Sequence, residues 1–578
     1  MKFWNNWDKQ RRKALRLCMI IIFLSLIACR QLFSPGYFPM HDDLQISRLY
    51  QIDKCVRDLQ IPCRWVPDMG YGYGYPLFNF YPPFPYYLGE VFHLVGFSLI
   101  NSVKLLFILG LTLSGFFMFL LASKFWGKLG GLVSAAFYIY APYQAVDIYV
   151  RGAMNEFWAI TFFPAIFWAI AELVKSRQKR YMGLLALFYG LLLLSHNIMT
   201  MVFTPLVAIW SFFLIWYYKK SLKALIPIIV GGVWGVGLAA FFTLPVIFEK
   251  QFVHVETMLM GYFNYLAHFV SLKQLFFSRF WGFGASTWGE GDEMPFQIGY
   301  LHWIVPAIAV VVFTLLGVKK KVSFRNWLLV TGYWLLFLFF AFLTHLRATP
   351  IWQTVKPLEY LQFPWRFLAI VIFALSFLAG SFVFSFEKLL GKKIRKSIFR
   401  SVVAGLVVAV VILNFGYFRP EKILKITDEE KLFSPKGWNK LQTDAIFDYL
   451  PVYAEKPPGE PAPKNLEVLE GKVGVTYLEK GTNWYQFQAR VIEGPATIRL
   501  PIFDFPNWKV WVDGRLVVTN NDNFLGLITF EVPVGDYDVF VRLTNTSIRT
   551  VSNLISLISW LALGFVVFRL FRKKYFDF

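Results

Sequence analysis

Charged residues are scarce in this chain. Only 16% of its 578 residues are charged, whereas 57% are hydrophobic and 19% are aromatic, and the mean hydropathy is +0.50. This balance excludes an ordinary soluble domain, because most of the surface must face lipid or other apolar segments. The composition therefore predicts an α-helical polytopic membrane protein.

The chain also lacks a basic domain that would suit a nucleic acid, although its formal net charge is +22. Lys and Arg fall in short clusters between apolar runs, and seven such segments hold 29 of the 58 basic residues. Cytoplasmic segments of membrane proteins are enriched in Lys and Arg. We therefore expect no nucleic-acid partner, a place in the cell membrane, and both the N-terminus and the C-terminus in the cytoplasm.

Twelve apolar segments are long enough, or nearly so, to cross about 30 Å of hydrocarbon. They lie near residues 14–33, 101–122, 129–142, 157–174, 181–195, 198–217, 224–248, 298–317, 326–345, 367–386, 401–417 and 551–571. Residues 1–417 then form a transmembrane domain with large outer loops at 34–100 and 249–297 and shorter outer loops at 143–156 and 346–366. We expect chemistry on this outer face, because most inner loops are too short to fold.

Residues 418–550 differ from the rest in their period-two alternation. Alternating stretches include "WYQFQARV", "ATIRLPI", "WKVWVDGRLVV", "LGLITFEV" and "YDVFVRL". The Asp513-Gly514 pair is a strong hairpin signal. We predict an extracytoplasmic antiparallel β-sandwich, which either binds a glycan or a partner or serves as a structural lid. Residues 551–578 would anchor it through a last span with a basic cytoplasmic tail.

Cysteine is rare, with four residues in the chain. Cys18 and Cys29 fall in the first apolar segment, where they are small apolar residues. Cys55 and Cys63 lie eight residues apart in the first outer loop. They either form a local disulfide in an oxidising compartment or remain free thiols.

The first outer loop contains the stretch "FPMHDDLQISRLYQ", residues 38–51. Apolar residues recur at helical spacing from this point on, at Leu49, Ile52, Val56 and Leu59. Polar residues lie between them, which predicts an amphipathic helix suited to the membrane interface.

Asp42 and Asp43 precede that helix. An Asp that caps a helix N-terminus stabilises it by about 1 kcal/mol, but this role needs only one of the two. The other would be a general base or a metal ligand for an acceptor that approaches from outside. We treat both as candidate catalytic residues, with Asp42 as the base and Asp43 as the cap, and His41 as a candidate substrate ligand.

Four outer-side cations adjoin predicted spans, at Arg151, Arg347, Lys356 and Arg366. Each could hold a phosphate group. The alternative for each is an interfacial anchor or the partner of a nearby acid, such as Glu156 for Arg151 or Glu359 for Lys356.

Two further groups are candidates for the site. His196 lies at the edge of a span in "LLLLSHNIMT", where it either binds substrate or bonds to Asn197 or a neighbouring helix. Glu290, Asp292 and Glu293 are close enough in sequence to bind a divalent cation such as Mg²⁺ or Mn²⁺, or they form a solvated loop tip. No metal ligand is assigned.

Six blocks of sequence carry a family resemblance. They are "HDD", "GYGYPLFNFYPPFPYYL", "APYQAVDIYVRGAMNEFWA", "LLLLSHNIMT", "FWGFGASTWGEGDEMPFQIGYLHW" and "LQFPWRFL". Together they resemble bacterial multi-pass proteins with the 6-pyruvoyl-tetrahydropterin synthase-related membrane domain, and "FPNWKVWVDGRLV" is similar to the end of YfhO-like membrane proteins. The chain lacks clustered His zinc ligands, so pterin chemistry is not expected.

Both groups resemble distant members of the C superfamily of glycosyltransferases (GT-C). In that superfamily an acidic motif in the first outer loop carries catalysis, and the donor is a sugar linked to a polyprenyl phosphate. The resemblance implies a GT-C-like fold and places Asp42 and Asp43 at the acidic position. It implies transfer of a sugar from this donor, held among membrane lipids, to an envelope glycan, lipid or protein.

Two other classes of function remain open. A transporter of lipid or polysaccharide would need polar or broken helices near the middle of the membrane, whereas the ionisable residues here gather at span ends and in outer loops. A non-catalytic scaffold for envelope assembly would need only the β-domain and the anchors. The acidic first loop favours an enzyme over both.

Overall fold

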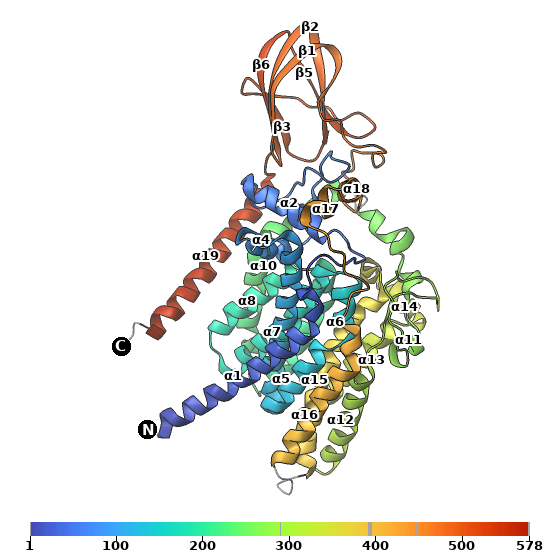
Figure 1. Ribbon diagram of the computed structural model, residues 1–578. Helices are drawn as coiled ribbons and strands as arrows, with labels where there is room; N and C mark the ends of the chain where they lie inside the picture. The colour runs from blue at the N-terminus through green and yellow to red at the C-terminus, as the bar shows by residue number, and fades with distance from the viewer. Residues whose placement is uncertain (1, 290, 391–395, 445–447, 576–578) are drawn as a thin grey trace. The chain divides into compact units, whose positions relative to one another are not determined.

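A computed structural model describes residues 2–289, 291–390, 396–444 and 448–575. The chain divides into two compact units. Unit 1 comprises residues Met1–Asp43, Ile100–Gly235 and Leu259–Lys425. Unit 2 comprises Leu44–Leu99, Val236–Met258 and Ile426–Phe578. Figure 1 shows the course of the chain by colour.

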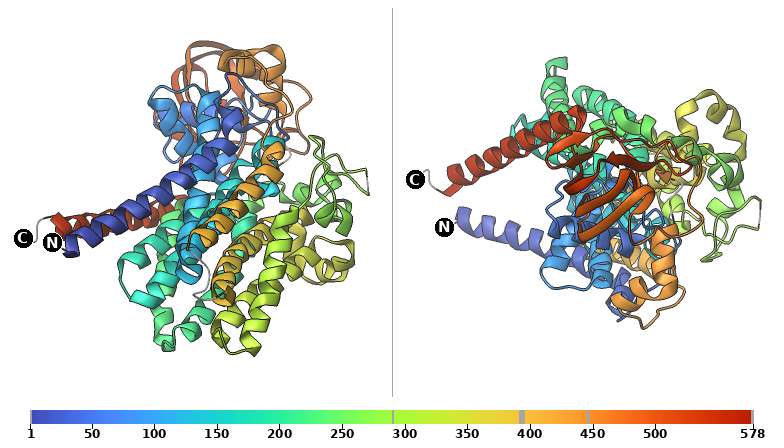
Figure 2. Two further views of the ribbon diagram at one scale, coloured as in Figure 1. Left: turned by 60° about the horizontal axis from the view of Figure 1, so that its bottom comes forward. Right: turned by 90° about the horizontal axis from the view of Figure 1, so that it is seen from above.

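Unit 1 is built from apolar helices that run side by side in every view (Figures 1 and 2). Its longer helices are α1 (Lys2–Ala28), α5 (Leu99–Ile139), α7 (Met154–Ser176), α8 (Arg180–Leu193), α9 (Asn197–Tyr217), α10 (Leu225–Glu249, which continues into unit 2), α12 (Tyr300–Val318), α13 (Phe324–Leu343), α15 (Leu368–Leu390) and α16 (Lys396–Asn414). Shorter turns connect them, including α6 (Pro142–Ala145), the π-helical η2 (Val146–Val150), α11 (Leu272–Phe276), α14 (Thr349–Thr354), η9 (Lys356–Leu361) and η10 (Pro364–Phe367).

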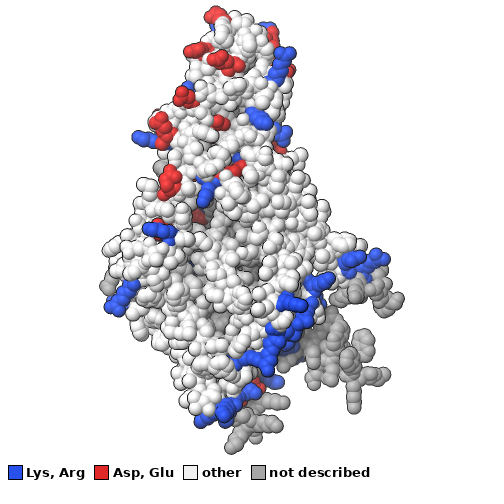
Figure 3. All heavy atoms as spheres, turned by 180° about the vertical axis from the view of Figure 1, so that it is seen from behind, with Lys and Arg blue, Asp and Glu red and all other residues white. Residues whose placement is uncertain are grey.

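The described part of the chain contains nine helices that are long and apolar enough to cross a membrane, one of them α19 (Ser547–Tyr575) of unit 2. Two shorter apolar helices cover Leu15–Ala28 and Arg180–Leu193. Each of the twelve predicted segments falls on one of these helices. Figure 3 shows a broad uncharged area across the middle of the visible face, with Lys and Arg gathered along the lower edge. The protein is therefore a multi-pass membrane protein.

One described helix, α5, contains two predicted spans. Gly127 interrupts it with φ 72° and ψ 172°, values that no residue of an α-helix adopts. This residue lies between the predicted spans 101–122 and 129–142, so the break marks the predicted inner turn. Glycine suits the position because it reaches positive φ without steric cost.

Helices α7 and α15 are the most buried of the candidate spans. Helix α15 packs against α12, α13 and α7, and α7 also packs against α8 and α9. Aromatic rings fill these contacts, as in the parallel stack of Phe163 on Phe203, with 4.0 Å between ring centroids. The first turn of α7 and the turn η10 before α15 carry Glu156 and Arg366, so these central helices position both side chains.

Unit 2 contains the predicted antiparallel β-domain, whose strands lie side by side in Figure 1. The strands are β1 (Glu467–Lys480), β2 (Trp484–Phe503), β3 (Trp508–Val512), β4 (Arg515–Val517), β5 (Leu527–Val532) and β6 (Gly535–Leu543). They form one hydrogen-bonded sheet in the order β1-β2-β6-β3-β4, and β5 also pairs with β2. The long strand β2 pairs with β6 along its first half and with β5 along its second.

Two details of the sheet concern the sequence pattern. The predicted hairpin at Asp513-Gly514 is confirmed, since both residues have positive φ between β3 and β4. Strand β1 has no counterpart among the alternating stretches. Its residues are almost all exposed, so neither face needs to be apolar and the alternation is lost.

The first outer loop forms the short helices α2 (Gln45–Arg57), α3 (Leu77–Phe80) and α4 (Phe84–Leu94) of unit 2, which also contains α17 (Asp428–Phe433) and α18 (Pro435–Thr443). Helix α2 buries polar as well as apolar residues, among them Arg48, Gln51 and Asp53. Part of the polar side of this predicted amphipathic helix is thus packed inside unit 2. Arg48 donates to the Tyr81 hydroxyl at 2.9 Å, and Gln51 donates to Asp68 at 2.8 Å.

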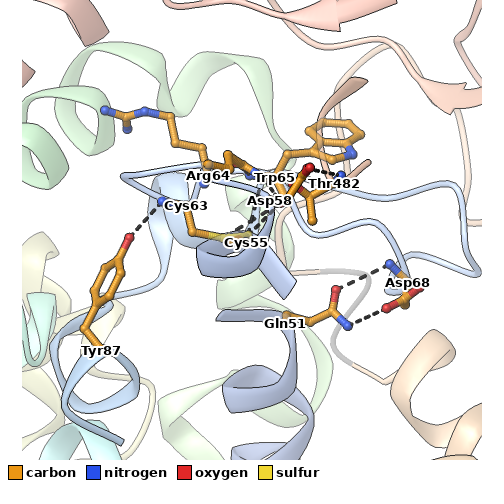
Figure 4. The surroundings of a disulfide bond; sticks show 10 residues. Gln51, Cys55, Asp58, Cys63, Arg64, Trp65, Asp68, Tyr87 and Thr482 are labelled. Carbon is orange, nitrogen blue, oxygen red and sulfur yellow. Dashed lines mark hydrogen bonds between the residues drawn. A yellow bond between two sulfur atoms is a disulfide. The ribbon is translucent and has the colours of Figure 1, made fainter. Parts of the chain in front are cut away.

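Cys55 and Cys63 are joined by a disulfide, with their Cα atoms 5.6 Å apart. Figure 4 shows the surroundings of this bond. The Cys63 amide donates to the Tyr87 hydroxyl at 2.8 Å, and Asp58 accepts from the Thr482 amide and hydroxyl, both at 2.6 Å. The end of α2 is thus tied to the turn between β1 and β2.

A buried network of charges joins the anchor helix α19 to the rest of unit 2. Glu249 accepts hydrogen bonds from Arg549 at 2.9 Å, from Asn79 at 2.9 Å and from Thr546 at 2.6 Å. Arg64 donates to Asn79 at 2.9 Å. Because such charges are costly to bury unless they are hydrogen-bonded, this network fixes where α19 begins.

Candidate functional site

A backbone contact joins two loops of unit 1, one before α2 and one before α7. The His41 amide donates to the Val150 carbonyl at 3.1 Å, and the Asp42 amide donates to the Arg151 carbonyl at 2.9 Å. These bonds bring the acidic motif of the first loop against the loop that precedes α7. Two segments more than 100 residues apart thereby meet at one place.

Gly152 permits this close approach. It has φ +62°, and a Cβ atom at this position would overlap the side chain of Met40. Any other residue would therefore need both an unfavourable backbone conformation and a shift of the 40–42 segment. The π-helical turn η2 directly before Arg151 is of a kind that is frequent at functional sites.

A buried charge cluster lies beside this contact, formed by Asp147, Arg151, Glu156 and Arg366. Arg151 donates to Asp147 Oδ1 at 2.5 Å and to Glu156 Oε2 at 2.8 Å. The Nε atom of Arg366 lies 3.3 Å from the same Glu156 oxygen. Glu156 therefore lies against two guanidinium groups at once, from the first turn of α7.

Tyrosine and tryptophan complete the walls around the charge cluster. The Tyr143 hydroxyl donates to Glu156 Oε1 at 2.5 Å. The Arg151 guanidinium lies 4.4 Å from the centre of the Trp365 ring, a distance that allows a cation–π interaction. These contacts hold the guanidinium in a fixed plane.

The electrostatics of the loop residues follow from burial. Burial raises the pKa of Asp147 well above its usual value, and Glu156 adds to this rise, although Arg151 opposes it. Burial lowers the pKa of Arg151, but Glu156, Tyr143 and Asp147 outweigh it and the net direction is upward. Arg151 therefore remains charged throughout the physiological range.

His196 lies within the electrostatic reach of the charge cluster. Burial and the charges of Arg366 and Arg151 lower its pKa to about 3, and only Glu156 acts in the other direction. Its Nδ1 accepts from the Met199 amide at 3.2 Å, so it caps α9. The neutral ring then carries its proton on Nε2, which makes that atom a donor.

His41 is exposed at the edge of the same region. Its Nε2 lies 2.9 Å from the Phe283 carbonyl. Partial loss of hydration and the charge of Arg151 lower the pKa of His41, whereas the Phe283 carbonyl raises it, and the net direction is downward. His41 thus links the acidic motif to the segment around residue 283.

The structure brings together most of the predicted site residues. Six of them lie in or around the charge cluster, namely His41, Asp42, Arg151, Glu156, His196 and Arg366. Asp43 follows Asp42 in the chain. The candidates that lie apart are Arg347, which is exposed, and Lys356, which pairs with Glu359 at 3.1 Å on the surface. The ion pairs Arg151–Glu156 and Lys356–Glu359, predicted as alternatives to phosphate binding, are confirmed.

The predicted helix cap is displaced by one residue. Helix α2 begins at Gln45, and its N-cap position is occupied by Leu44, whose side chain makes no capping bond. The assignment of Asp43 as the N-cap residue is therefore wrong. The turn over Asp43 and Leu44 delays the helix beyond the point that the sequence pattern indicated.

Two members of the site were missed, Tyr143 and Trp365. Both lie within blocks that were singled out, "APYQAVDIYVRGAMNEFWA" and "LQFPWRFL". The feature of the sequence that could have identified them is an aromatic residue close to a charged candidate at the end of a span. Aromatic residues are so frequent at membrane interfaces that this signal alone is weak.

The acidic loop was a candidate for a divalent cation. Glu290 lies outside the described residues. Both carboxylate oxygens of Asp292 accept bonds, from the Thr287 amide at 2.6 Å and from the Gln274 side chain at 3.0 Å. Asp292 therefore closes the loop, and the described residues contain no group of three or more His, Cys, Asp or Glu that could hold a metal ion.

No family model matches the chain. An uncharacterized protein from Lactococcus lactis subsp. cremoris (strain MG1363) is 26% identical over 321 residues, which cover 52% of this chain and 50% of the relative. The chain thus aligns with about half the length of the curated relative it matches.

Several membrane glycosyltransferases of known structure are similar to this chain. The mycobacterial arabinofuranosyltransferase AftD is 12% identical with a TM-score of 0.45, over 72% of this chain and 28% of its own. The oligosaccharyltransferase AglB from Archaeoglobus fulgidus, in complex with an inhibitory peptide and a dolichol-phosphate, is 14% identical with a TM-score of 0.41, over 78% and 61%. ArnT from Cupriavidus metallidurans, bound to undecaprenyl phosphate, is 14% identical with a TM-score of 0.32, over 70% of each chain. Likenesses at these TM-scores carry no information about activity, so the function is argued from the residues of the site.

Proposed function

We propose that this protein is an integral membrane glycosyltransferase with a GT-C-like fold. It transfers a sugar from a polyprenyl-phosphate-linked donor to an envelope acceptor on the extracytoplasmic face. The observation that carries the proposal is the backbone pairing of His41 and Asp42 with Val150 and Arg151. This pairing supports it because it brings the backbone of the acidic motif against the segment that leads into Arg151 and Glu156.

The chemistry needs a base for the acceptor and positive charge for the leaving phosphate. Asp42 takes the proton of the acceptor hydroxyl, whose oxygen bonds to the anomeric carbon. The bond from that carbon to the phosphate oxygen breaks, and the electron pair stays on the polyprenyl phosphate. Arg366 supplies positive charge for this phosphate, and the Nε2–H of His196 supplies a hydrogen-bond donor.

Arg151 has a different role in this scheme. Two carboxylates and the Tyr143 hydroxyl already surround its guanidinium. It therefore acts as a positioning residue, which holds Glu156 and, through its own carbonyl, the backbone of Asp42.

The proposal is tested by mass spectrometry of lipid-linked sugars and envelope polymers. Cells that lack the protein should accumulate one lipid-linked donor and lose one sugar from an envelope polymer. Wild-type protein and the Arg347→Gln variant, which changes an exposed arginine away from the charge cluster, should restore both. Asp42→Asn should restore neither while reaching the membrane normally.

The same measurement separates the alternative classes. A transporter would change the side on which the lipid-linked sugar accumulates and would leave the polymer linkages unchanged. A scaffold would be restored by Asp42→Asn as well as by the wild type. Either result would contradict the glycosyltransferase proposal.

A further inference from the structure

An open groove lies in unit 1, apart from the charge cluster. It encloses about 330 Å³, within the range of about 300–1,000 Å³ that is typical of ligand sites. Its walls come from the 3-10 turns around residues 259–266 and from the segment that contains α14 and η9. Its lining includes Phe263, Asn264, Tyr265, Gln353 and Glu359.

The floor of the groove is rigid. The Tyr265 ring stacks on Trp352, with ring centroids 5.0 Å apart and an interplanar angle of 15°. Trp352 is fully buried, and its indole N–H donates to the Leu343 carbonyl at 3.0 Å. Because both rings are fixed by packing, the groove exists before a ligand arrives, which lowers the entropic cost of binding.

The polar lining of the groove suits hydroxyl groups. Gln353 and Asn264 carry amides, which both donate and accept, and Glu359 carries a carboxylate, which accepts. The partly exposed Phe263 ring offers aromatic surface, on which the C–H groups of a sugar ring can pack. A sugar ring presents both hydroxyl and C–H groups, so it matches a lining that is both polar and aromatic.

The charge of the groove argues against an anionic ligand. The cation at its rim, Lys356, is paired with Glu359 at 3.1 Å, so the pair adds no net positive charge. A phosphate or an anionic lipid headgroup would meet the Glu359 carboxylate without an excess of cations to offset it.

Packed aromatic rings lie between the groove and the candidate active site. The Phe263 ring packs on Phe363, with centroids 6.2 Å apart. Phe363 in turn stacks on Trp365 at 4.8 Å and lies 4.9 Å from the Arg366 guanidinium. A glycan in the groove would therefore have to extend past Phe263 and Phe363 to reach Arg366, so the groove suits sugar rings other than the one that reacts.

We propose that this groove binds the glycan part of the acceptor, through sugar rings next to the one that carries the reacting hydroxyl. The inference rests on the proposed function and names glycan, rather than lipid or protein, as the acceptor class. The Glu359 carboxylate and the two amides bind hydroxyl groups, and the Phe263 ring binds a sugar face.

The test uses the purified full chain in detergent on an array of bacterial envelope oligosaccharides, with phospholipid spots and unglycosylated peptides as the other probes. Wild-type protein should bind at least one oligosaccharide. Glu359→Gln, Gln353→Ala and Phe263→Ala should each weaken this binding about tenfold, as expected for loss of one good contact. Thr354→Ala is the matched control, since Thr354 is exposed one residue beyond Gln353 and bonds only within its own helix at the Pro350 carbonyl.

Asp42→Asn separates the two proposals. It should bind the same oligosaccharide as tightly as the wild type, because Asp42 is not part of the groove, while transfer is lost. If the wild-type protein binds glycan through the groove but has no transferase activity, the proposed function is contradicted and the groove proposal stands. Binding of lipid or peptide in place of glycan, no bound glycan, or equal binding by the groove variants and Thr354→Ala would overturn the groove proposal.

Discussion

The amide of Asp42 donates to the carbonyl of Arg151 across a distance of 2.9 Å. Together with the bond from the His41 amide to the Val150 carbonyl, it joins the first acidic loop to the loop before α7, where Arg151 also binds Asp147 and Glu156. Because these bonds involve main-chain atoms, they position the backbone of Asp42 independently of its side chain.

The two aspartates should respond differently to amidation. Asp42→Asn should lower the rate of sugar transfer by about 100-fold or more, because an amide oxygen is a poor base. Asp43→Asn should retain most of the activity. The measurement is single-turnover transfer in membranes that contain equal amounts of each variant. Normal transfer by both variants would remove the central residue of the mechanism.

Gly152 should be needed to place Asp42. Gly152→Ala forces a Cβ atom into Met40 and imposes a strained positive φ, so the 40–42 segment must shift, and the rate should fall about tenfold or more. Gly127→Ala is the matched control. Gly127 also has positive φ, at 72°, but nothing lies within 4 Å of its Cβ position. Equal losses in both variants would indicate backbone strain rather than displacement of Asp42.

Glu156 should be required for stability as well as activity. Glu156→Gln leaves Arg151 and Arg366 without their shared counter-charge, and breaking such a buried pair costs about 3–5 kcal/mol. The exposed Lys356–Glu359 pair provides the comparison, since Glu359→Gln should change stability by about 0–1 kcal/mol. Thermal unfolding in detergent measures both. The double variant Glu156→Gln, Arg366→Gln should be more stable than Glu156→Gln alone, because it also removes a buried charge that has lost its partner. Equal or lower stability of the double variant would contradict this explanation.

Local sequence patterns predicted the helices well because an apolar span is encoded by consecutive residues. The break in α5 at Gly127 and the Asp513-Gly514 hairpin follow from the same local rules. The site could be predicted only in part. Arg347 and Arg366 look alike in sequence, yet one is exposed and the other reaches Glu156.

What separates these two arginines is tertiary packing. The Arg366 side chain is directed by the contact of α15 with α7, and no spacing along the chain encodes that contact. The pairing of residues 41–42 with 150–151 could not be predicted from the sequence either. Main-chain hydrogen bonds can be formed by almost any residue type, so they do not restrict which residues occur there. Strand β1 was missed because its side chains are exposed on both faces.

The folded protein should lose stability at acid pH because of His196. Its pKa falls to about 3 from an ordinary value of 6.5, so the unfolded chain takes up a proton at higher pH than the folded protein does. The stability that neutral His196 contributes is fully present above about pH 6.5 and is lost as the pH falls through about 3. His196→Asn should flatten this part of the profile, because Asn does not titrate but still caps α9.

Thermal unfolding of wild type and His196→Asn between pH 7 and pH 4 measures the difference. His196→Ala separates capping from titration, since it should be about 1 kcal/mol less stable than His196→Asn at every pH. Parallel profiles for wild type and His196→Asn would show that the imidazole is not buried neutral as described.

Glu90 should give unit 2 the opposite pH dependence. This residue of α4 is only 2% exposed, and burial together with the nearby Asp53 raises its pKa to about 7 from 4.5, although His93 and Arg57 oppose the rise. The folded protein therefore keeps a proton that the unfolded chain releases. The resulting stability is fully present below about pH 4.5 and is lost as the pH rises through about 7.

Glu90→Gln imitates the protonated form and should make α2 and α4 more stable than in the wild type at pH 8, but not at pH 5. Hydrogen exchange of the amides in these two helices, which pack against each other, measures the effect locally. Glu470→Gln, at an exposed position of β1, is the control and should change neither profile. The contrary result would be a wild-type exchange rate in α2 and α4 that does not depend on pH after correction for intrinsic exchange. It would show that Glu90 is ionised in the folded protein. The buried carboxyl groups of Glu90 and Asp53 would then need another counter-charge.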